Sequence, residues 1–374
     1  MLSERRVAII GAGVIGASIA DALASRGVRV TLFDMRAPGA GASQASAGVL
    51  APFIEAKPGS PLLALGARSL LMWDDFMAGV RDRAPGHEVE YVRTGTLEVA
   101  LSDEEHAHLT TAAAWLASEG VTHDWLEGPA LVARAPMVTS AARGALHLPD
   151  HRIVNVGALV RALVQAARLS GAVCVTPTEI VHVEQVRHGV EVRIGDQRHT
   201  FDHVVIAAGS WTRRVRVAGV PVFPVRPIRG QLLHVRWPDG ARPAHSIWGT
   251  RCYTVPWADG SLLVGATVED VGFDERATVA GVRELMDAVV GLLPSAADAS
   301  LEAVRVGLRP ATADHLPLLG PLSSHPGVIL AAGHYRNGIL LAPLTADIVS
   351  KLVLNNERDA ALDLVSPERF YGYT

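Results

Sequence analysis

Four polar side chains interrupt an apolar segment near the end of the chain. His334, Tyr335, Arg336 and Asn337 stand between two glycines in the stretch AAGHYRNGILLAP, residues 331–343. Burying polar groups without partners is costly, so a plain core segment would not carry four of them. The question is therefore what these four side chains face.

A second stretch with chemical potential lies at the N-terminus. Gly11-Ala12-Gly13-Val14-Ile15-Gly16 is a GxGxxG sequence that follows an expected strand, Val7–Ile10. The expected elements after it are a helix over Ala17–Arg26 and a strand over Val28–Phe33, which closes with Asp34. This strand, helix and strand pattern is typical of a dinucleotide site.

Each glycine of the motif has a predicted physical role. Gly11 allows the tight turn, Gly13 lets the backbone approach a pyrophosphate at the helix N-terminus, and Gly16 allows the helix to pack closely on the strand. Asp34 is placed to accept hydrogen bonds from a ribose. The motif alone leaves open whether the dinucleotide is NAD or FAD.

Three further stretches bear on that choice. GAGASQASAGVLAP, residues 39–52, consists mostly of small residues and hydroxyls, and it offers backbone amides with Ser43 and Ser46 to a flat ligand. DHVVIAAGSW, residues 202–211, is expected to be a buried strand ending in Ala-Gly, where the backbone passes close to another group. GLRPATADHLPLLG, residues 307–320, is the third.

Composition limits the other functions. The chain has 374 residues, 49% of them hydrophobic, with a formal net charge of −4 and no basic stripe for nucleic acid. Cys174 and Cys252 are its only cysteines, which predicts small buried residues and a cytoplasmic location. We expect no transmembrane span, because the apolar runs break at Gly, Pro or charges. Peripheral membrane attachment stays open.

The histidines do not predict a metal site. His147 and His151 have helical i, i+4 spacing, but Pro149 between them argues against a helix there. We therefore expect no metal. The chain also shows no Ser-His-Asp or paired-carboxylate pattern for acid–base catalysis.

The ordered set of motifs resembles the D-amino acid oxidase family of FAD-dependent amine oxidases. The set comprises the GxGxxG with Asp34, GASQASAGVLAP, VVIAAGSW, GLRPATADHLPLLG and GHYRNGILLAP. Cys252-Tyr253 with the Val-Pro that follows, together with GHYRNGILLAP, is most similar to the glycine oxidases of thiamine biosynthesis. The resemblance extends from about residue 5 to about residue 355, with few diagnostic residues between about 60 and 150.

The resemblance implies an α/β fold in which a Rossmann-like FAD-binding domain interleaves with an α+β, antiparallel-sheet substrate domain. The implied FAD-binding parts are residues 1–86, 146–217 and 302–374, and the substrate-domain parts are 87–145 and 218–301. Sequence texture agrees with the following expected elements: strands at Leu97–Leu101, Gln231–Val235, Arg251–Pro256, Ser261–Thr267 and Val328–Ala332, and helices at 103–119, at 276–293 and from about Ile339.

The resemblance also implies the substrate site. Arg309 falls on the family's GxRP position, where a guanidinium binds the substrate carboxylate through two parallel hydrogen bonds. Tyr253 matches the tyrosine that donates its hydroxyl to the same carboxylate, and Arg336 matches a second arginine on the substrate side. Without the family, Arg309 would be interpreted as a surface or structural ion-pair residue and Tyr253 as a half-buried strand residue.

The cofactor implied is non-covalent FAD, because neither cysteine stands where covalent sarcosine oxidases attach it. The residues implied to bind it are Gly11, Gly13, Val14, Ile15, Gly16, Asp34, Met35, Ala42, Ser43, Ala47, Gly48, Val49, Ile180, Gly209, His334, Tyr335, Arg336, Asn337, Gly338, Ile339 and Leu340. The helix after Gly338 is expected to point its partly positive N-terminus at the flavin.

The implied activity is oxidative deamination of glycine, sarcosine or small D-amino acids by hydride transfer to the flavin. No protein acid or base is obligatory, oxygen is the expected acceptor, and the imine is hydrolysed or passed to thiazole synthesis. We expect a homo-oligomer. The alternatives are a flavin dehydrogenase that passes electrons to a quinone or partner subunit, a non-catalytic flavin-binding module, and a nicotinamide dehydrogenase.

Overall fold

The structure is a computed structural model that describes residues 5–55, 59–180, 182–238 and 242–371. Its strands form four sheets, with six, four, eight and three strands. Among the helices of these described residues, none is long and apolar enough to cross a membrane.

The six-stranded sheet is built around the first strand of the chain. Strand β1 is parallel to its neighbours β2 and β13, and the parallel pairing continues to β9 on one side and β21 on the other. Only the edge strand β20 is antiparallel to its neighbour. In spatial order the strands are β20 (Leu318–Leu322), β21 (His325–Ala332), β13 (His203–Ile206), β1 (Arg6–Ile10), β2 (Arg29–Phe33) and β9 (Val173–Val175).

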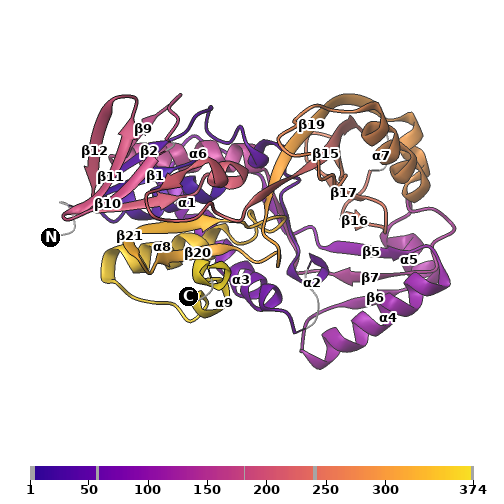
Figure 1. Cartoon of the computed structure of the whole chain (residues 1–374). Coiled ribbons are helices and arrows are strands. Elements are labelled where there is room, and N and C mark those ends of the chain that lie inside the picture. The colour runs from indigo at the N-terminus through magenta and orange to yellow at the C-terminus, as the bar shows by residue number, and fades with distance from the viewer. Residues whose placement is uncertain (1–4, 56–58, 181, 239–241, 372–374) are drawn as a thin grey trace.

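Helices cover one face of this sheet and a second sheet covers the other (Figure 1). The helices bury apolar residues against the strands: α1 (Val14–Ala24), α3 (Pro61–Arg83), α6 (Val156–Leu169) and α8 (Ala342–Asn355). The four-stranded sheet on the opposite face consists of β12 (Gln197–Phe201), β11 (Gly189–Ile194), β10 (His182–Val186) and β14 (Arg216–Val217). The predicted Rossmann-like layers are therefore present.

The eight-stranded sheet lies beside these layers, at the right of Figure 1. Neighbouring strands are antiparallel in the pairs described, except that β16 is parallel to β5. Its strands are, in spatial order, β19 (Ser300–Ala311), β15 (Arg226–Arg236), β18 (Ser261–Gly265), β17 (Tyr253–Pro256), β16 (Ser246–Trp248), β5 (Thr96–Ala100), β7 (Gly144–Leu148) and β6 (Asp124–Leu126). Its helices are α4 (Asp103–Ser118), α5 (Gly128–Arg134) and α7 (Val279–Leu292).

A small sheet follows the serine-rich segment. Strand β3 (Val49–Leu50) pairs with β8 (Arg152–Val154), which also pairs with β4 (Tyr91–Val92). The short elements that remain are α2 (Pro52–Glu55), α9 (Leu362–Val365) and the 3-10 turns η2 (Ala42–Ala45), η3 (Gly209–Arg214), η4 (Pro294–Asp298) and η5 (Pro367–Phe370).

Most predicted elements are present, with shifted ends that have local causes. Helix α1 begins at Val14 rather than Ala17, because the N–H of Ala17 already donates to the carbonyl of Gly13 at 2.9 Å. Helix α7 begins at Val279 rather than 276, because the Thr278 side chain caps it by accepting from Gly281 N–H.

The last predicted helix is also shorter at its start. Residues 339–341 form turns, and α8 begins at Ala342 with Pro343 in its first turn. Proline is tolerated there because its missing N–H would have no partner inside the helix. The predicted start at Ile339 was therefore wrong by three residues.

The predicted domain ranges stay a proposal. The proposed boundary between 145 and 146 falls inside β7 (Gly144–Leu148), and the boundary between 301 and 302 falls inside β19 (Ser300–Ala311). Both strands belong to the eight-stranded sheet throughout their length.

Candidate active site

A large pocket lies where the carboxyl ends of the parallel strands meet the eight-stranded sheet. Its lining includes Gly11 after β1, Asp34 after β2, Ala207 after β13 and Ala332 at the end of β21, with Arg309 on the opposite side from β19. The carboxyl edge of a parallel sheet is where such folds bind ligands. Its empty volume, which includes solvent at its open mouth, is about 1750 Å³, and its lining extends from the glycine turn after β1 to Arg309.

The predicted site residues gather in this one pocket, with a single exception. All three predicted substrate residues and every predicted cofactor residue except Gly16 line it. A Cβ on Gly16 would stand 1.8 Å from the carbonyl oxygen of Gly11, so this glycine serves the close packing of α1 on the turn. What each lining residue binds stays a prediction.

The glycine turn and Asp34 form one end of the pocket. The Asp34 carboxylate accepts from the backbone N–H of Ala12 at 2.6 Å and of Arg36 at 2.8 Å. Burial raises the pKa of Asp34, and these hydrogen bonds oppose that rise. Gly13 caps α1 with no side-chain hydrogen bond, and a Cβ there would be 3.4 Å from Ser43 Oγ. A pyrophosphate therefore has an open approach to the positive end of α1.

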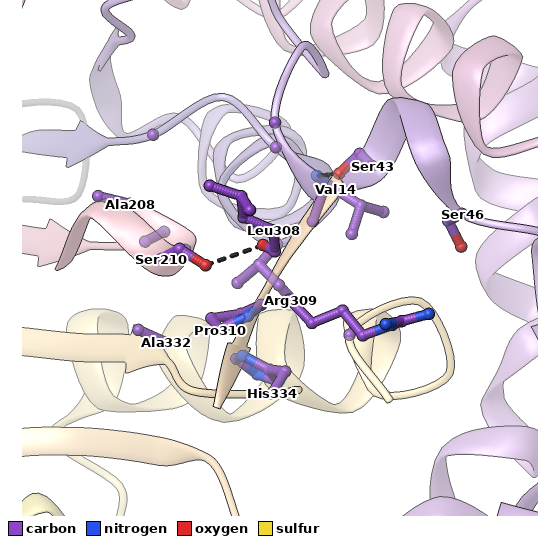
Figure 2. A pocket seen from close by; sticks show the side chains of 18 of the residues that line it. Val14, Ser43, Ser46, Ala208, Ser210, Leu308, Arg309, Pro310, Ala332 and His334 are labelled. Carbon is purple, nitrogen blue, oxygen red and sulfur yellow. Dashed lines mark hydrogen bonds between the residues drawn. The ribbon is translucent and has the colours of Figure 1, made fainter. Parts of the chain in front are cut away.

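The serine-rich segment lines the middle of the pocket. Ser43 Oγ accepts from the Val14 N–H at 3.0 Å, which joins this segment to the start of α1 (Figure 2). Ser46 Oγ instead accepts from Gly48 N–H at 3.2 Å. Gly307 of β19 lies directly against the 3-10 turn η2, since a Cβ there would be 2.8 Å from Ala45 Cβ. The segment is thus a packed wall of the pocket.

The side chain of Arg309 extends from β19 into the pocket (Figure 2). Its guanidinium lies over the backbone of Gly230 on the neighbouring strand β15, where a Cβ would come within 2.3 Å of Arg309 Cζ. Arg309 Nη1 donates to the carbonyl of Thr267 at 2.9 Å and to that of Arg229 at 3.4 Å. These contacts hold the guanidinium at the pocket wall.

Tyr253 lines the same pocket from β17. Its ring stacks on Trp248 with centroids 4.7 Å apart and planes at 20°. Gly265 on the adjacent strand leaves space for the ring, because a Cβ there would be 2.6 Å from the Tyr253 hydroxyl oxygen. Trp248 also lines the pocket but was not predicted, because nothing in its local sequence separates it from a core tryptophan.

The loop from His334 to Leu340 closes the pocket on the side of α8. His334 is buried, with its Nε2 3.0 Å from Thr345 Oγ1, and burial lowers its pKa to about 3. Tyr335 has a φ of +49°, and its N–H donates to the Pro310 carbonyl at 2.8 Å, next to Arg309. A bulky residue is strained in this left-handed region, so surrounding contacts must hold its backbone in place. The hydrogen bond to Pro310 is one such contact, and it ties the loop to β19.

Within the same loop, Arg336 and Leu340 have opposite environments. Arg336 lines the pocket with an exposed side chain, at the side open to solvent. Leu340 is buried, and its carbonyl accepts from Ser69 Oγ at 2.6 Å and Trp73 Nε1 at 3.0 Å. The loop is therefore anchored on α3, a helix that we did not predict.

A further cluster that we did not predict borders the pocket near Asp34. Arg36 forms a bidentate ion pair with Glu275, at 2.9 and 2.7 Å, and its guanidinium lies 4.3 Å from the centroid of the Trp211 ring. Arg214 lies equally close, at 4.3 Å, to the ring of Phe273. The cluster joins the turn between β18 and α7 to the dinucleotide end. It combines residues far apart in the sequence, so no local pattern could have indicated it.

The histidines considered for metal binding have other surroundings. His147 Nδ1 is 3.0 Å from Asp124 Oδ2, while His151 stacks on Phe53 with centroids 5.8 Å apart. Among the described residues, no group of three or more His, Cys, Asp or Glu side chains is arranged to hold a metal. Cys252 is buried, and burial raises its pKa to about 12, whereas Cys174 is only partly buried.

The layers, the glycine turn and the pocket at the carboxyl ends of the strands are typical of a dinucleotide-binding protein, and comparison with known proteins identifies the cofactor and the class of enzyme. The chain belongs to the DAO family of FAD-dependent oxidoreductases, whose sequence profile matches residues 6–352. It is therefore an FAD-dependent oxidoreductase of the amine-oxidising type, as predicted. The alternatives of a nicotinamide dehydrogenase and a non-catalytic module do not hold.

Individual relatives agree with this family. The chain is 34% identical to a glycine oxidase of Geobacillus kaustophilus over 96% of this chain and 94% of that protein. It is also 34% identical to the bifunctional protein ThiO/ThiG of a Nostoc species, over 96% of this chain and 54% of that protein. The crystal structure of glycine oxidase from Geobacillus kaustophilus matches with a TM-score of 0.92 and 33% identity, covering 98% of this chain and all of that one.

Proposed function

We propose that this chain oxidatively deaminates glycine, sarcosine or small D-amino acids and forms hydrogen peroxide. For glycine, the balanced reaction converts glycine, oxygen and water to glyoxylate, ammonia and hydrogen peroxide. The observation that carries the proposal is the position of Arg309, whose guanidinium borders the same pocket as the glycine turn after β1. Similarity to glycine oxidases supports the same substrate class.

The substrate carboxylate is the group that Arg309 would bind. A guanidinium offers two parallel N–H donors to a carboxylate, and the hydrogen bond from Nη1 to the Thr267 carbonyl holds this guanidinium at the pocket wall. The Tyr253 hydroxyl would donate to the same carboxylate, and Arg336 adds positive charge at the solvent side. Together these groups would fix the substrate Cα by its carboxylate.

The residues that line this end of the pocket favour small substrates. The stacked rings of Trp248 and Tyr253 form one wall, and Ala51, Ala266 and Val268 line other parts of the pocket. Rigid aromatic walls restrict the space for a substrate side chain. This arrangement supports glycine, sarcosine and small D-amino acids over larger ones.

The amine must lose its proton before the Cα hydrogen leaves as hydride. Burial disfavours the charged ammonium form, and the positive charges of Arg309 and Arg336 act in the same direction. His334 stays neutral because its pKa is about 3, so it adds no charge to the buried wall. When bound, FAD supplies the acceptor for the hydride.

We propose the predicted set of cofactor residues for FAD, in two groups. The turn residues Gly11 and Gly13 with Asp34 would hold the adenosine and pyrophosphate end. The segment 42–49 and the loop 334–340 would border the flavin end. Gly16 supports the first group through packing and is not proposed to touch FAD.

A role in supplying the imine for thiazole synthesis is part of the same proposal. It is supported by the similarity to the bifunctional protein ThiO/ThiG. The test is to express this chain in cells that lack their own glycine oxidase and to ask whether growth without thiamine is restored.

The main test follows the visible flavin band after anaerobic mixing with glycine, sarcosine and D-alanine in turn. We expect at least one of them to bleach the band, and admission of air to restore it with one equivalent of hydrogen peroxide. Bleaching without peroxide in air would instead favour a dehydrogenase that passes electrons to a partner. A band that no small amino acid bleaches would contradict the proposal.

A further inference from the structure

Backbone carbonyls fix the guanidinium of Arg309. Its Nη1 donates to the carbonyls of Thr267 and Arg229, and Gly230 between these strands leaves the space that the guanidinium fills. An arginine side chain has several rotatable bonds, so its aim depends on such fixed acceptors. The question is what keeps the two carbonyls in place.

The two carbonyls belong to a short pairing of β15 with the segment after β18. Arg229 and Glu269 form an isolated antiparallel bridge, with N–H to carbonyl distances of 2.8 and 3.0 Å. Next to it, the Thr267 N–H donates to the Gln231 carbonyl at 3.2 Å, and the Gln231 N–H donates to Thr267 Oγ1 at 2.9 Å. Strand β18 itself ends at Gly265, so this pairing extends beyond the regular sheet.

Side chains hold this pairing together, and the Glu269 carboxylate lies at their centre. Its Oε2 accepts from Arg229 Nη2 at 2.6 Å, and its Oε1 accepts from Gln231 Nε2 at 2.8 Å and Thr267 Oγ1 at 2.6 Å. Arg229 donates further to Asp274 at 2.9 Å. Arg229, Gln231 and Thr267 are each less than 5% exposed, so their polar groups depend on these bonds.

The carboxylate is held in its charged form. Burial would raise the pKa of Glu269, but hydrogen bonds from Arg229, Gln231 and Thr267 lower it to about 2. Glu269 with Arg229, Gln231 and Thr267 is called the Glu269 network. Its carboxylate therefore stays ionised, and its hydrogen bonds stay unchanged, over the pH range of enzyme assays.

We propose that Glu269 is a positioning residue for substrate binding, because it holds the carbonyls of Thr267 and Arg229 that aim the Arg309 guanidinium. This inference rests on the proposed binding of the substrate carboxylate by Arg309. Glu269 does not line the pocket, whereas its neighbour Val268 does. The network thus acts from behind the pocket wall.

The variant that tests this role is Glu269→Gln. Glutamine keeps the size and one acceptor oxygen, but its amide nitrogen cannot accept from Arg229, so the pairing loosens. The matched control is Asp270→Asn, which removes the same charge from the next residue, where Asp270 forms an exposed ion pair with Arg226 and neither residue lines the pocket. Both variants are measured as holoenzymes with FAD bound.

The readout is selective for carboxylates. We expect Glu269→Gln to raise the KM for glycine and the Kd for acetate, read from the flavin spectrum, by about tenfold, as supporting residues of a binding site typically do. We expect kcat and turnover of glycinamide, which lacks the carboxylate, to change less than about twofold. Asp270→Asn should leave acetate binding unchanged. A merely structural loss would affect glycinamide and glycine alike and would overturn the proposal.

A double-mutant cycle with Arg309→Ala separates this inference from the proposed function. If Glu269 acts through Arg309, its substitution should add less than about twofold once Arg309 is alanine. Equal losses in both backgrounds would overturn the inference and leave the role of Arg309 intact. Normal acetate binding by Arg309→Ala alone would remove the proposed carboxylate site, and the inference with it.

A second pair of variants covers a Glu269→Gln protein that does not fold. Thr267→Val removes the hydroxyl that links Glu269 to the pairing, and it should weaken acetate binding selectively. Thr267→Ser keeps the hydroxyl and should bind acetate as the unsubstituted protein does. Equal acetate affinity in the valine and serine variants would overturn the proposal.

Discussion

Arg309 depends on one glycine and two carbonyls that lie far from it in the sequence. Gly230 makes room for its guanidinium, and the carbonyls of Thr267 and Arg229 hold it; Gly265 makes room for Tyr253 in the same way. The GxRP sequence predicted which arginine faces the pocket. It carried no information about these supports, because they come from other strands.

At the residue scale, the first prediction concerns the geometry of the guanidinium. Arg309→Lys keeps the positive charge but loses the second parallel N–H donor, so the KM for glycine should rise by about tenfold. Arg309→Ala should lose far more affinity and still bind FAD with an unchanged visible spectrum. Steady-state kinetics of the two variants checks this order, and equal KM values for glycine in Arg309→Lys and Arg309→Ala would contradict it.

Wherever a motif carried them, the residues named from the sequence lie together around one pocket, and what each of them binds stays a prediction. The predicted residues of the glycine turn, the serine-rich segment and the loop 334–340 line the pocket, apart from Gly16. Trp211 and Arg36 were missed, because they acquire their places through contact with each other across the sequence. Trp248 was missed because nothing in its local sequence separates it from a core tryptophan. Motifs therefore indicated which residues meet, but not what surrounds them.

At the element scale, the second and third glycines of the GxGxxG motif, Gly13 and Gly16, have separable roles. Gly13→Ala places its Cβ 3.4 Å from Ser43 Oγ, which the fold tolerates, but it fills the space where a pyrophosphate would lie. Gly16→Ala places its Cβ 1.8 Å from a backbone oxygen and forces α1 away from the turn. We expect the first variant to fold but bind FAD weakly, and the second to be destabilised.

The measurement compares thermal unfolding of the apoproteins with titration of FAD. Gly13→Ala should unfold near the temperature of the unsubstituted apoprotein and show a raised Kd for FAD, while Gly16→Ala should unfold at a lower temperature. Gly27→Ala, whose Cβ would meet nothing within 4 Å, is a control away from the pocket, though its φ of +82° adds some strain. Equal Kd values for Gly13→Ala and the unsubstituted protein would contradict the role proposed for Gly13.

Helix ends were less predictable than the elements themselves. The starts of α1, α7 and α8 depend on caps and turns that involve single residues, such as Thr278 for α7. Helix α3 was not predicted, although its buried residues Leu65, Ser69, Trp73, Met77 and Val80 follow a spacing of three and four. That spacing is a helical signal, and an analysis of periodicity over residues 61–83 would have found it.

At the scale of the whole molecule, a buried histidine predicts how stability depends on pH. His151 is buried against Phe53, no partner is described for either ring nitrogen, and burial lowers its pKa to about 3. The unfolded chain takes up a proton near the ordinary value of about 6.5, whereas the folded chain does not until about pH 3. The free energy of unfolding therefore falls as pH drops from about 6.5 toward 3.

Replacing the His151 side chain should reduce this loss of stability at low pH. His151→Phe keeps an aromatic ring against Phe53 but cannot take up a proton, so the fall in Tm between pH 7 and pH 5 should be smaller than in the unsubstituted holoprotein. His87→Gln removes an exposed histidine and is the control. Equal falls in Tm for His151→Phe and the unsubstituted protein would contradict the role of His151.

The two large sheets could be predicted only through the family resemblance. Apolar strands indicated that sheets exist, but the order β20-β21-β13-β1-β2-β9 pairs residues as far apart in the sequence as Val7 and His203. Such pairings are decided by tertiary packing, which local patterns do not report. The four-stranded and three-stranded sheets were not predicted for the same reason.

That strand order also determines when neighbouring strands can pair during synthesis of the polypeptide. Strand β1 leaves the ribosome first, yet its neighbour β13 ends at Ile206 and the next strand, β21, ends at Ala332. Until the last of them emerges, the open edges of the nascent sheet stay unpaired and prone to aggregation. We therefore expect slower translation, or chaperones that shield those edges, to raise the yield of folded enzyme in a foreign host.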